Sequence, residues 1–350
     1  METNSITKSA MLMFIMVLGA LAAWEIHLRK AGVTRTYDDG GPLWTDKRSQ
    51  VYIPADKATV FIGSSRIKFD LDIPTWKALT GNKAIQLACV GSNPIPVLQD
   101  LADDKYFKGR LVVDVTEILF FSTSPHNLES PLDNIHYYKD RTPAQRASFA
   151  INHLLESQLA FLDKDNFSLN AHLRKLPIKD RTGIHSEPIF PWQFGRVNYD
   201  RQETMTTDFV NDTSLQRRVT NIWEFFRSIS KEPPASGAKL DSLLNVVKVA
   251  TDKIKARGGS VFFVRTPSSG PFWQGEQMGY PREKYWSRIL QTTGCDGLHF
   301  KDYPALSHFI CPEWSHLKPQ DAIVFTKEFI RILRKEKGWK FLVAATEVNN

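Results

Sequence analysis

A short apolar run that ends abruptly in small polar residues constrains the fold of this chain more than any other feature. Every residue from Thr59 to Ile62 is β-branched or aromatic, which is typical of a strand buried on both faces of a parallel sheet. Gly63 then permits a tight turn, and Ser64 and Ser65 follow directly. Such a strand delivers hydroxyl groups to the edge of a sheet. A neighbouring base would have to take a proton before either serine could attack a substrate.

Strand-like and helix-like segments alternate along most of the chain, which is typical of an α/β protein. The apolar segments are short where they resemble strands and follow helical spacing elsewhere. The predicted strands are 59–62, 83–89, 110–115 and 260–264, with a short apolar element at 298–300, and the predicted helices are 67–80, 94–105, 239–257, 281–291 and 319–333. We therefore expect a mostly parallel sheet covered by helices.

The alternation stops within the stretch 122–235, which we expect to be an insertion. Two helical patterns lie in it, one from Thr142-Pro143 to about Leu162 and one that Ser214 opens. An aromatic loop at 188–195 separates them. Two interpretations are equally open: the insertion caps a site at the sheet edge, or it is a surface subdomain that only adds core.

Charge and cysteine content narrow the function classes. The 350 residues carry a net charge of +7, but the basic residues are scattered among acidic ones instead of forming a stripe. This pattern argues against nucleic-acid binding and is compatible with acidic polymers or anionic membrane surfaces. Cys89, Cys295 and Cys311 lack the spacing of a zinc site, so we expect no metal. Cys295 and Cys311 either form a disulfide or remain buried thiols.

The N-terminus is a membrane-directed segment. Residues 10–24 carry no charge, but this run is short beside the ~20 residues that span a bilayer. We favour an uncleaved anchor over residues 1–30, and a signal peptide cleaved near Ala20-Leu21-Ala22 is the alternative. Basic residues flank both ends, so charge does not set the orientation, and we assume that the bulk of the chain crosses the membrane. Residues 31–57 are then expected to form a linker that packs onto a domain at 58–340.

A candidate base lies near the C-terminus. Glu313 and His316 are three residues apart on a predicted turn just before the helix that Pro319 opens. That spacing lets a carboxylate reach Nδ1 of the imidazole while Nε2 faces a serine, as in a catalytic triad. Because Glu-x-x-His arises often by chance, the pair is weak evidence when taken alone.

Two further positions are candidates for binding negative charge. Gly91 follows the second predicted strand, where its backbone N–H at a helix start would face an oxyanion, or where the glycine merely makes a tight turn. Arg265 follows the strand 260–264 and would either hold an anionic group or pair with the insertion.

Taken together, these segments resemble the conserved blocks of the GDSL/SGNH hydrolase superfamily in order and separation. The resemblance rests on Gly63-Ser64-Ser65-Arg66, Gly91 and Glu313-Trp314-Ser315-His316, and it covers about 55–125 and 235–335. It implies a three-layer α/β/α sandwich with a mostly parallel, flavodoxin-like sheet. It also implies that Ser65 is the nucleophile and His316 the base, with Glu313 in place of the usual aspartate. The Ser65 and Gly91 amides would form the oxyanion hole.

The chain departs from that pattern in its third block. The family has Gly-x-Asn-Asp after the third strand, where this chain has Asp114-Val115-Thr116-Glu117. Losing one oxyanion donor can cost ~100-fold or more in rate. With its membrane segment, the chain is similar to the SGNH-like proteins that accompany membrane-bound O-acyltransferases, such as the DltD-like and alginate-acetylation proteins.

That resemblance implies an extracytoplasmic O-acyltransferase that moves an acyl group, expected to be acetyl, to or from a cell-envelope polysaccharide. The alternatives are an SGNH esterase and a catalytically inactive scaffold that binds a polymer or membrane partner. The implied partners are an acyl donor, a glycan acceptor and a membrane-bound O-acyltransferase, with no cofactor. The implied location is the cell membrane, with a single pass and the main domain periplasmic or extracellular. The candidate substrate-binding residues are Ser64, Arg66, Asn93, Glu117 and Arg265.

Overall fold

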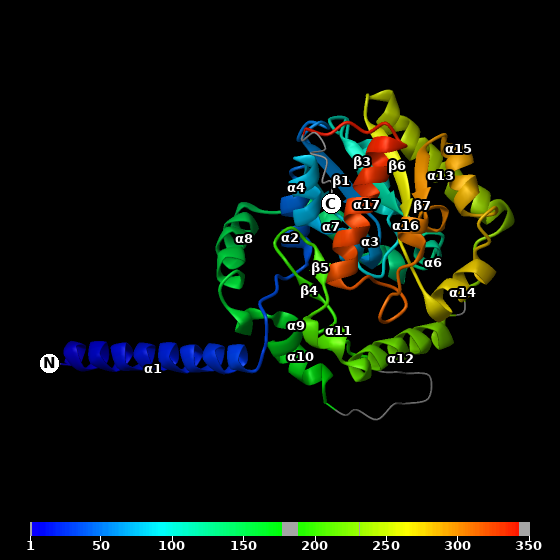
Figure 1. Cartoon of the computed structure of the whole chain (residues 1–350). Helices are drawn as coiled ribbons and strands as arrows, with labels where there is room; N and C mark the ends of the chain where they lie inside the picture. The colour runs from blue at the N-terminus through cyan, green and yellow to red at the C-terminus, as the bar shows by residue number, and fades with distance from the viewer. Residues whose placement is uncertain (1, 177–187, 231, 343–350) are drawn as a thin grey trace. The chain divides into compact units, whose positions relative to one another are not determined.

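The computed structural model describes residues 2–176, 188–230 and 232–342 (Figure 1). They fall into two units. The helical unit comprises residues 1–38 and 146–189, and the sheet unit comprises residues 39–145 and 190–350. The sheet unit contains every residue that the sequence singled out as a candidate for catalysis or binding.

A five-stranded parallel sheet forms the centre of the sheet unit, in the order β2-β1-β3-β6-β7. Its strands are β1 (Ala58–Ile62), β2 (Lys83–Gln86), β3 (Arg110–Asp114), β6 (Ser260–Arg265) and β7 (Asp296–His299). Val60 pairs with Ile85 on one side and with Leu111 on the other, so the chain order reverses about β1. The prediction of a mostly parallel α/β sheet is confirmed. The loops that leave the carboxyl ends of β1 and β3 therefore run in opposite directions, which is where ligands bind in sheets of this kind.

Helices pack on both faces of this sheet (Figure 1). Side chains alternate along β1, so Val60 and Ile62 join one hydrophobic cluster and Phe61 joins the other. The first cluster is completed by α2 (Gly41–Arg48), α5 (Ile95–Asp103), α7 (His126–Asp140), α13 (Gly237–Ala256) and α15 (Trp286–Thr293). The second is completed by α3 (Ser65–Asp70), α4 (Ile73–Thr80), α16 (Pro304–Ser307) and α17 (Pro319–Lys335).

One predicted helix is broken in two. The pattern at 67–80 predicted a single helix, but α3 ends at Asp70 and α4 begins at Ile73. Asp72 starts the second helix because its carboxylate accepts a hydrogen bond from the backbone N–H of Thr75 at 2.8 Å. Because of this break, α3 continues directly from the turn after β1, and α4 packs against α17.

Residues 39–57 belong to the sheet unit, where α2 packs onto the domain. Trp44 on α2 is fully buried and donates a hydrogen bond to the Leu87 carbonyl at 2.9 Å. Arg48 pairs with Asp100 at 2.7 Å and with Asp104 at 2.9 Å. An eight-residue helix is too short to show a helical period in sequence, which is why the stretch looked irregular.

All three cysteines are buried free thiols. Cys295 belongs to the hydrophobic cluster on one face of the sheet, and Cys311 belongs to the cluster on the other face. The alternative in which these two residues form a disulfide is therefore excluded. The sheet separates two positions that are only sixteen residues apart in sequence (311 − 295).

The expected insertion divides between the two units. Its last part, residues 190–235, belongs to the sheet unit and contains β4 (Arg196–Val197), β5 (Glu203–Thr204), α11 (Thr207–Asn211) and α12 (Thr213–Ile229). The helix predicted to start near Ser214 is α12, so that prediction is confirmed. Phe194, Phe209 and Val219 form a hydrophobic cluster with Phe69 of α3, which attaches this part of the insertion to the helix that follows β1.

The helical unit contains the N-terminal helix α1 (Glu2–Lys30) and the middle of the insertion. Within α1, residues Ser5–Lys30 are long and apolar enough to cross a membrane, and by length and composition they fit a membrane span or a signal sequence. The unit also contains α8 (Pro143–Glu156) from Arg146 onward, η1 (Ala160–Leu162), α9 (Lys164–Phe167) and α10 (Leu169–Arg174). The helix start predicted at Thr142-Pro143 is confirmed by α8.

Candidate active site

Ser65 is the first residue of α3, directly beyond the turn that ends β1. Gly63 makes this turn where the backbone is crowded. A Cβ at position 63 would lie 2.6 Å from the Cβ of Asp114 and 2.9 Å from a methyl carbon of Ile67. The glycine therefore lets the chain pass beside β3 before Ser64 and Ser65 emerge at the carboxyl end of the sheet.

Ser65, His316 and Glu313 form a continuous chain of hydrogen bonds. The Ser65 hydroxyl lies 2.8 Å from Nε2 of His316, and Nδ1 of His316 lies 2.9 Å from Oε1 of Glu313. The backbone N–H of His316 donates to the same carboxylate oxygen at 2.7 Å. Glu313 and His316 are buried, whereas Ser65 is half-buried. A carboxylate, an imidazole and a hydroxyl in this order can deprotonate the hydroxyl.

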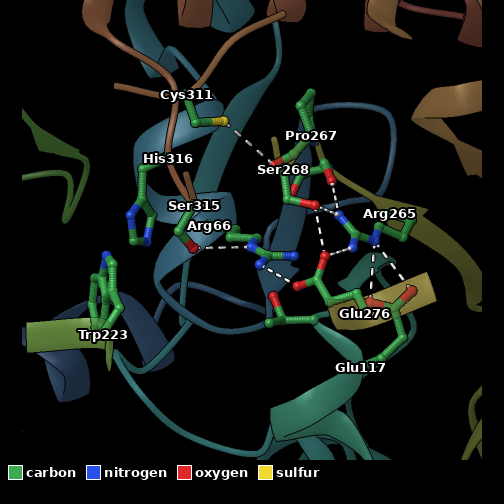
Figure 2. Close-up of polar contacts among 12 residues, drawn as sticks. Arg66, Glu117, Trp223, Arg265, Pro267, Ser268, Glu276, Cys311, Ser315 and His316 are labelled. Carbon is green, nitrogen blue, oxygen red and sulfur yellow. Dashed lines mark hydrogen bonds and ion pairs between the residues drawn. The ribbon is translucent and has the colours of Figure 1, made fainter. Parts of the chain in front are cut away.

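Trp223 is a fourth member of this chain that sequence reasoning missed. Its indole Nε1 donates to Oε2 of Glu313 at 2.6 Å, so both carboxylate oxygens are engaged. Trp223 lies on α12, and Figure 2 shows it beside His316. The apolar face predicted for this helix included its neighbours Ile222 and Phe226. No sequence pattern, however, indicated that the indole would reach a carboxylate 90 residues away.

Aromatic rings surround the imidazole of His316. The ring centroid of Phe69 lies 4.5 Å away, that of Phe194 lies 5.6 Å away and that of Trp223 lies 6.2 Å away. Phe194 and Trp223 come from the insertion, so its part within the sheet unit covers the histidine. Of the two interpretations of the insertion, a cap over the site describes residues 190–229.

The loop that carries Glu313 and His316 is tied to the helix that carries Ser65. Asp70, at the end of α3, accepts a hydrogen bond from the backbone N–H of Leu317 at 2.9 Å. Burial raises the pKa of Asp70 well above its usual range. Between the two triad residues, Trp314 has a φ of 80°, a left-handed conformation that is strained for a bulky residue.

A buried ion cluster lies next to the triad (Figure 2). Glu276 of α14 (Gly270–Gly279) is paired with both Arg66 and Arg265, and Figure 2 shows it between them. Arg265 also contacts both carboxylate oxygens of Glu117 at 3.1 Å. Arg66 donates to the Ser315 hydroxyl at 3.2 Å, so the cluster reaches the loop between Glu313 and His316.

The charges within this cluster offset one another. Burial opposes ionisation of Glu276, but Arg265 and Arg66 outweigh it and lower the pKa of Glu276 to about 2. Ser268 adds a hydrogen bond to the same carboxylate at 2.7 Å. Three candidates for substrate binding, Arg66, Glu117 and Arg265, are therefore buried and paired with protein groups. Their positions support a structural role for the cluster.

The remaining candidates lie in different environments. Asn93 is buried and donates to the carbonyls of Phe120 and Ser122 at 3.1 and 2.8 Å, so its amide joins the turn after β2 to the segment after β3. Ser64 is buried, and among the described residues its hydroxyl has no hydrogen-bond partner. Gly91 is exposed with a φ of 63°, a conformation that favours glycine.

Residues 114–117, at the end of β3 and just beyond it, contain no asparagine. Asp114 accepts hydrogen bonds from Thr116 at 3.2 Å and from Thr266 at 3.1 Å. Burial raises the pKa of Asp114 to about 6, although Arg66 and Arg265 partly offset that effect. The side chains of Thr116 and Glu117 are thus engaged with Asp114 and Arg265.

No protein-family model matches this chain, and no curated protein matches it significantly. Across residues 2–176, 188–230 and 232–342, no group of three or more histidine, cysteine, aspartate or glutamate side chains is arranged to hold a metal ion.

Proposed function

We propose that this protein is a serine acyltransferase of the SGNH type, anchored to a membrane, that moves an acyl group through Ser65. The observation that carries the proposal is the hydrogen-bonded chain from Ser65 through His316 to Glu313, at 2.8 and 2.9 Å. Such a chain holds a base at the nucleophile and a carboxylate behind the base.

In the first half-reaction, His316 takes the proton of Ser65 as its hydroxyl oxygen attacks the acyl carbonyl of a donor. Glu313 keeps the imidazole oriented and stabilises the imidazolium that forms. The tetrahedral intermediate then collapses, and the leaving group departs with the proton from His316. The product is an acyl ester on Ser65.

In the second half-reaction, a sugar or polyol hydroxyl gives its proton to His316 and attacks the ester. Collapse of this intermediate releases the acylated acceptor and returns the proton to Ser65. Hydrolysis would differ only in using water as the acceptor. The aromatic rings of Phe69, Phe194 and Trp223 around the buried imidazole support transfer, because they limit the approach of water from those sides.

Backbone amides would stabilise the oxyanion in this mechanism. Ser65 is the first residue of α3, and exposed Gly91 lies on the loop beyond β2. The start of that loop lies beside the turn before Ser65, because the backbone N–H of Cys89 donates a hydrogen bond to the Gly63 carbonyl at 3.2 Å. Residues 114–117 at the end of β3 contain no asparagine that could serve as a further oxyanion donor. We therefore expect the rate of hydrolysis to be ~100-fold lower than with a complete set of oxyanion donors.

The order and placement of the strands support assignment to the SGNH superfamily. The sheet order β2-β1-β3-β6-β7 is that of a flavodoxin-like sheet, and Ser65 lies just beyond the carboxyl end of β1. Helices on both faces would make it a three-layer α/β/α sandwich.

The N-terminal helix supports a location at the cell membrane. We propose that α1 is retained as a single membrane pass and that the sheet unit lies on the periplasmic or extracellular side. The acceptor would then be a cell-envelope or exported polysaccharide, with acyl groups supplied by a membrane-bound O-acyltransferase.

An acyl-partition experiment tests the proposal. The purified full chain is given an activated acetyl ester with and without a glycan acceptor, and acetyl-Ser65, acetylated glycan and free acetate are quantified by mass spectrometry. We expect acetyl-Ser65 to accumulate and transfer to exceed hydrolysis. Rapid release of acetate regardless of acceptor would identify an esterase instead. No acylation and no labelling by a fluorophosphonate would identify an inactive scaffold.

Trp223→Phe should lower the acylation rate about 10-fold, because it removes the N–H donor that holds Oε2 of Glu313 and so loosens the carboxylate that orients His316. The measurement is the single-turnover rate of acylation, with thermal unfolding measured alongside it.

Phe226→Leu is the control for Trp223→Phe, since it alters packing on the same helix without removing a donor. It should change the acylation rate less than Trp223→Phe does. Equal losses of rate in the two variants would show that Trp223 contributes packing only.

A further inference from the structure

The helix α8 presents an apolar face outward. Ala147, Ile151 and Leu154 follow helical spacing, and the side chains of Ile151, Leu154 and Leu155 are 62%, 59% and 44% exposed. The residues on the opposite face, among them Phe149, are half-buried. This arrangement is the reverse of a water-facing surface helix, which turns its apolar face inward.

The short helix α10 repeats this arrangement. Leu169 and Leu173 are four residues apart in α10 (Leu169–Arg174), so they share one face, and Leu176 lies two residues beyond the end of the helix. Their side chains are 75%, 49% and 57% exposed, whereas Ala171 on the opposite side is buried. Single exposed leucines are ordinary on protein surfaces, but two helices of one unit that both expose an aliphatic row require an explanation.

Both helices belong to the unit that contains α1, and hydrogen bonds connect that helix to the segment between them. Glu25 accepts hydrogen bonds from the backbone N–H groups of Ala160 and Phe161 at 3.0 and 3.1 Å. Arg35 donates to the Ser157 carbonyl at 2.7 Å. The C-terminal end of α8 is therefore held at the end of the membrane-directed helix. Leu155 lies five residues before Ala160, within about 18 Å of extended chain.

Exposed basic side chains belong to the same unit. They are Lys30, Arg146, Arg174 and Lys175. An amphipathic helix that has aliphatic residues on one face and basic residues beside it is typical of a segment lying in the interfacial layer of a membrane. Basic residues of this kind attract anionic headgroups.

We propose that the outward faces of α8 and α10 lie in the lipid headgroup layer beside α1, so that the helical unit rests on the bilayer. The aliphatic rows would be buried to about 5–10 Å, which is the usual depth of an interfacial helix. The occupant of these faces is a lipid surface, because Glu25 of the helix long and apolar enough to span the bilayer holds the segment between α8 and α10. This inference is independent of the chemistry at Ser65.

Lipid-borne quenchers test the proposal on the full chain reconstituted in vesicles. Ile151→Cys and Leu173→Cys are labelled with an environment-sensitive fluorophore. The native cysteines are buried, and labelling of the unsubstituted chain measures their background. Asn152→Cys and Asn170→Cys are matched controls, since each polar residue is exposed on the same helix but turned away from the aliphatic row. All four sites are exposed, so we expect unchanged thermal unfolding.

We expect spin-labelled lipids to quench the probes at positions 151 and 173 several-fold more than the probes at 152 and 170. Anionic lipid should increase the difference. Equal quenching at all four positions would overturn the proposal. Shielding of 151 and 173 from an aqueous quencher without quenching by lipid would also overturn it, because a second copy or another protein would then cover these faces.

Discussion

Ser65→Ala should abolish formation of an acyl-enzyme, with a loss of at least ~10⁴-fold in the rate of acylation. The reason is chemical, since no other described hydroxyl is hydrogen-bonded to Nε2 of His316. His316→Gln should reduce the rate to a similar extent because it removes the base, and the two losses should not add. Intact-protein mass spectrometry after exposure to an acyl donor or a fluorophosphonate measures both effects.

Ser64→Ala is the matched control for Ser65→Ala. The Ser64 hydroxyl is buried and unpaired among the described residues, so removing it should leave labelling intact. Labelling that survives in Ser65→Ala but disappears in Ser64→Ala would identify Ser64 as the nucleophile. Labelling unaffected by His316→Gln would show that the reaction does not require the triad.

Glu276→Gln should destabilise the folded protein by about 3–5 kcal/mol at neutral pH, because it leaves the buried guanidinium groups of Arg66 and Arg265 without their shared carboxylate. The effect should depend on pH. The pKa of Glu276 is lowered from 4.5 to about 2, so its contribution is fully present above pH 4.5. That contribution is lost as the pH falls from 4.5 towards 2.

Urea unfolding of the wild-type protein and Glu276→Gln across this pH range measures the difference. The two free energies of unfolding should converge as the pH falls. Glu283→Gln is the control, since Glu283 is exposed and its loss should change stability by less than about 0.5 kcal/mol. Equally small effects of the two substitutions, or a difference that stays constant with pH, would contradict a stabilising role for the cluster.

The elements predicted best from the sequence are those whose buried residues follow a regular pattern. β1, β3 and β6 are continuous apolar runs because both faces of a parallel strand are covered by helices. α13 and α17 are long enough for their buried residues to repeat at helical spacing. Short helices such as α2 and α3 are missed or merged, because one or two turns do not establish a period.

The candidate triad could be proposed from sequence because its members lie in local motifs. Ser65 follows a strand and a glycine turn, and the spacing of Glu313 and His316 lets one side chain reach the other within a turn. The partners added by the structure are remote in sequence. Trp223 comes from the insertion, and Arg66 meets Glu276 across 210 residues. No periodicity or local spacing encodes such contacts, since they depend on how separate elements pack.

By itself the sequence determined the parallel α/β core, the membrane-directed N-terminus and the residues that could act at the carboxyl end of the sheet. These follow from hydrophobic periodicity, chain polarity and short motifs, all of which are local. Only the tertiary structure decided that Ser65 rather than Ser64 meets His316 and that Arg66, Glu117 and Arg265 pair with protein carboxylates or arginines. It also placed Cys295 and Cys311 on opposite faces of the sheet. The physical reason is that pairing, burial and side-chain direction depend on the packing of elements far apart in the chain.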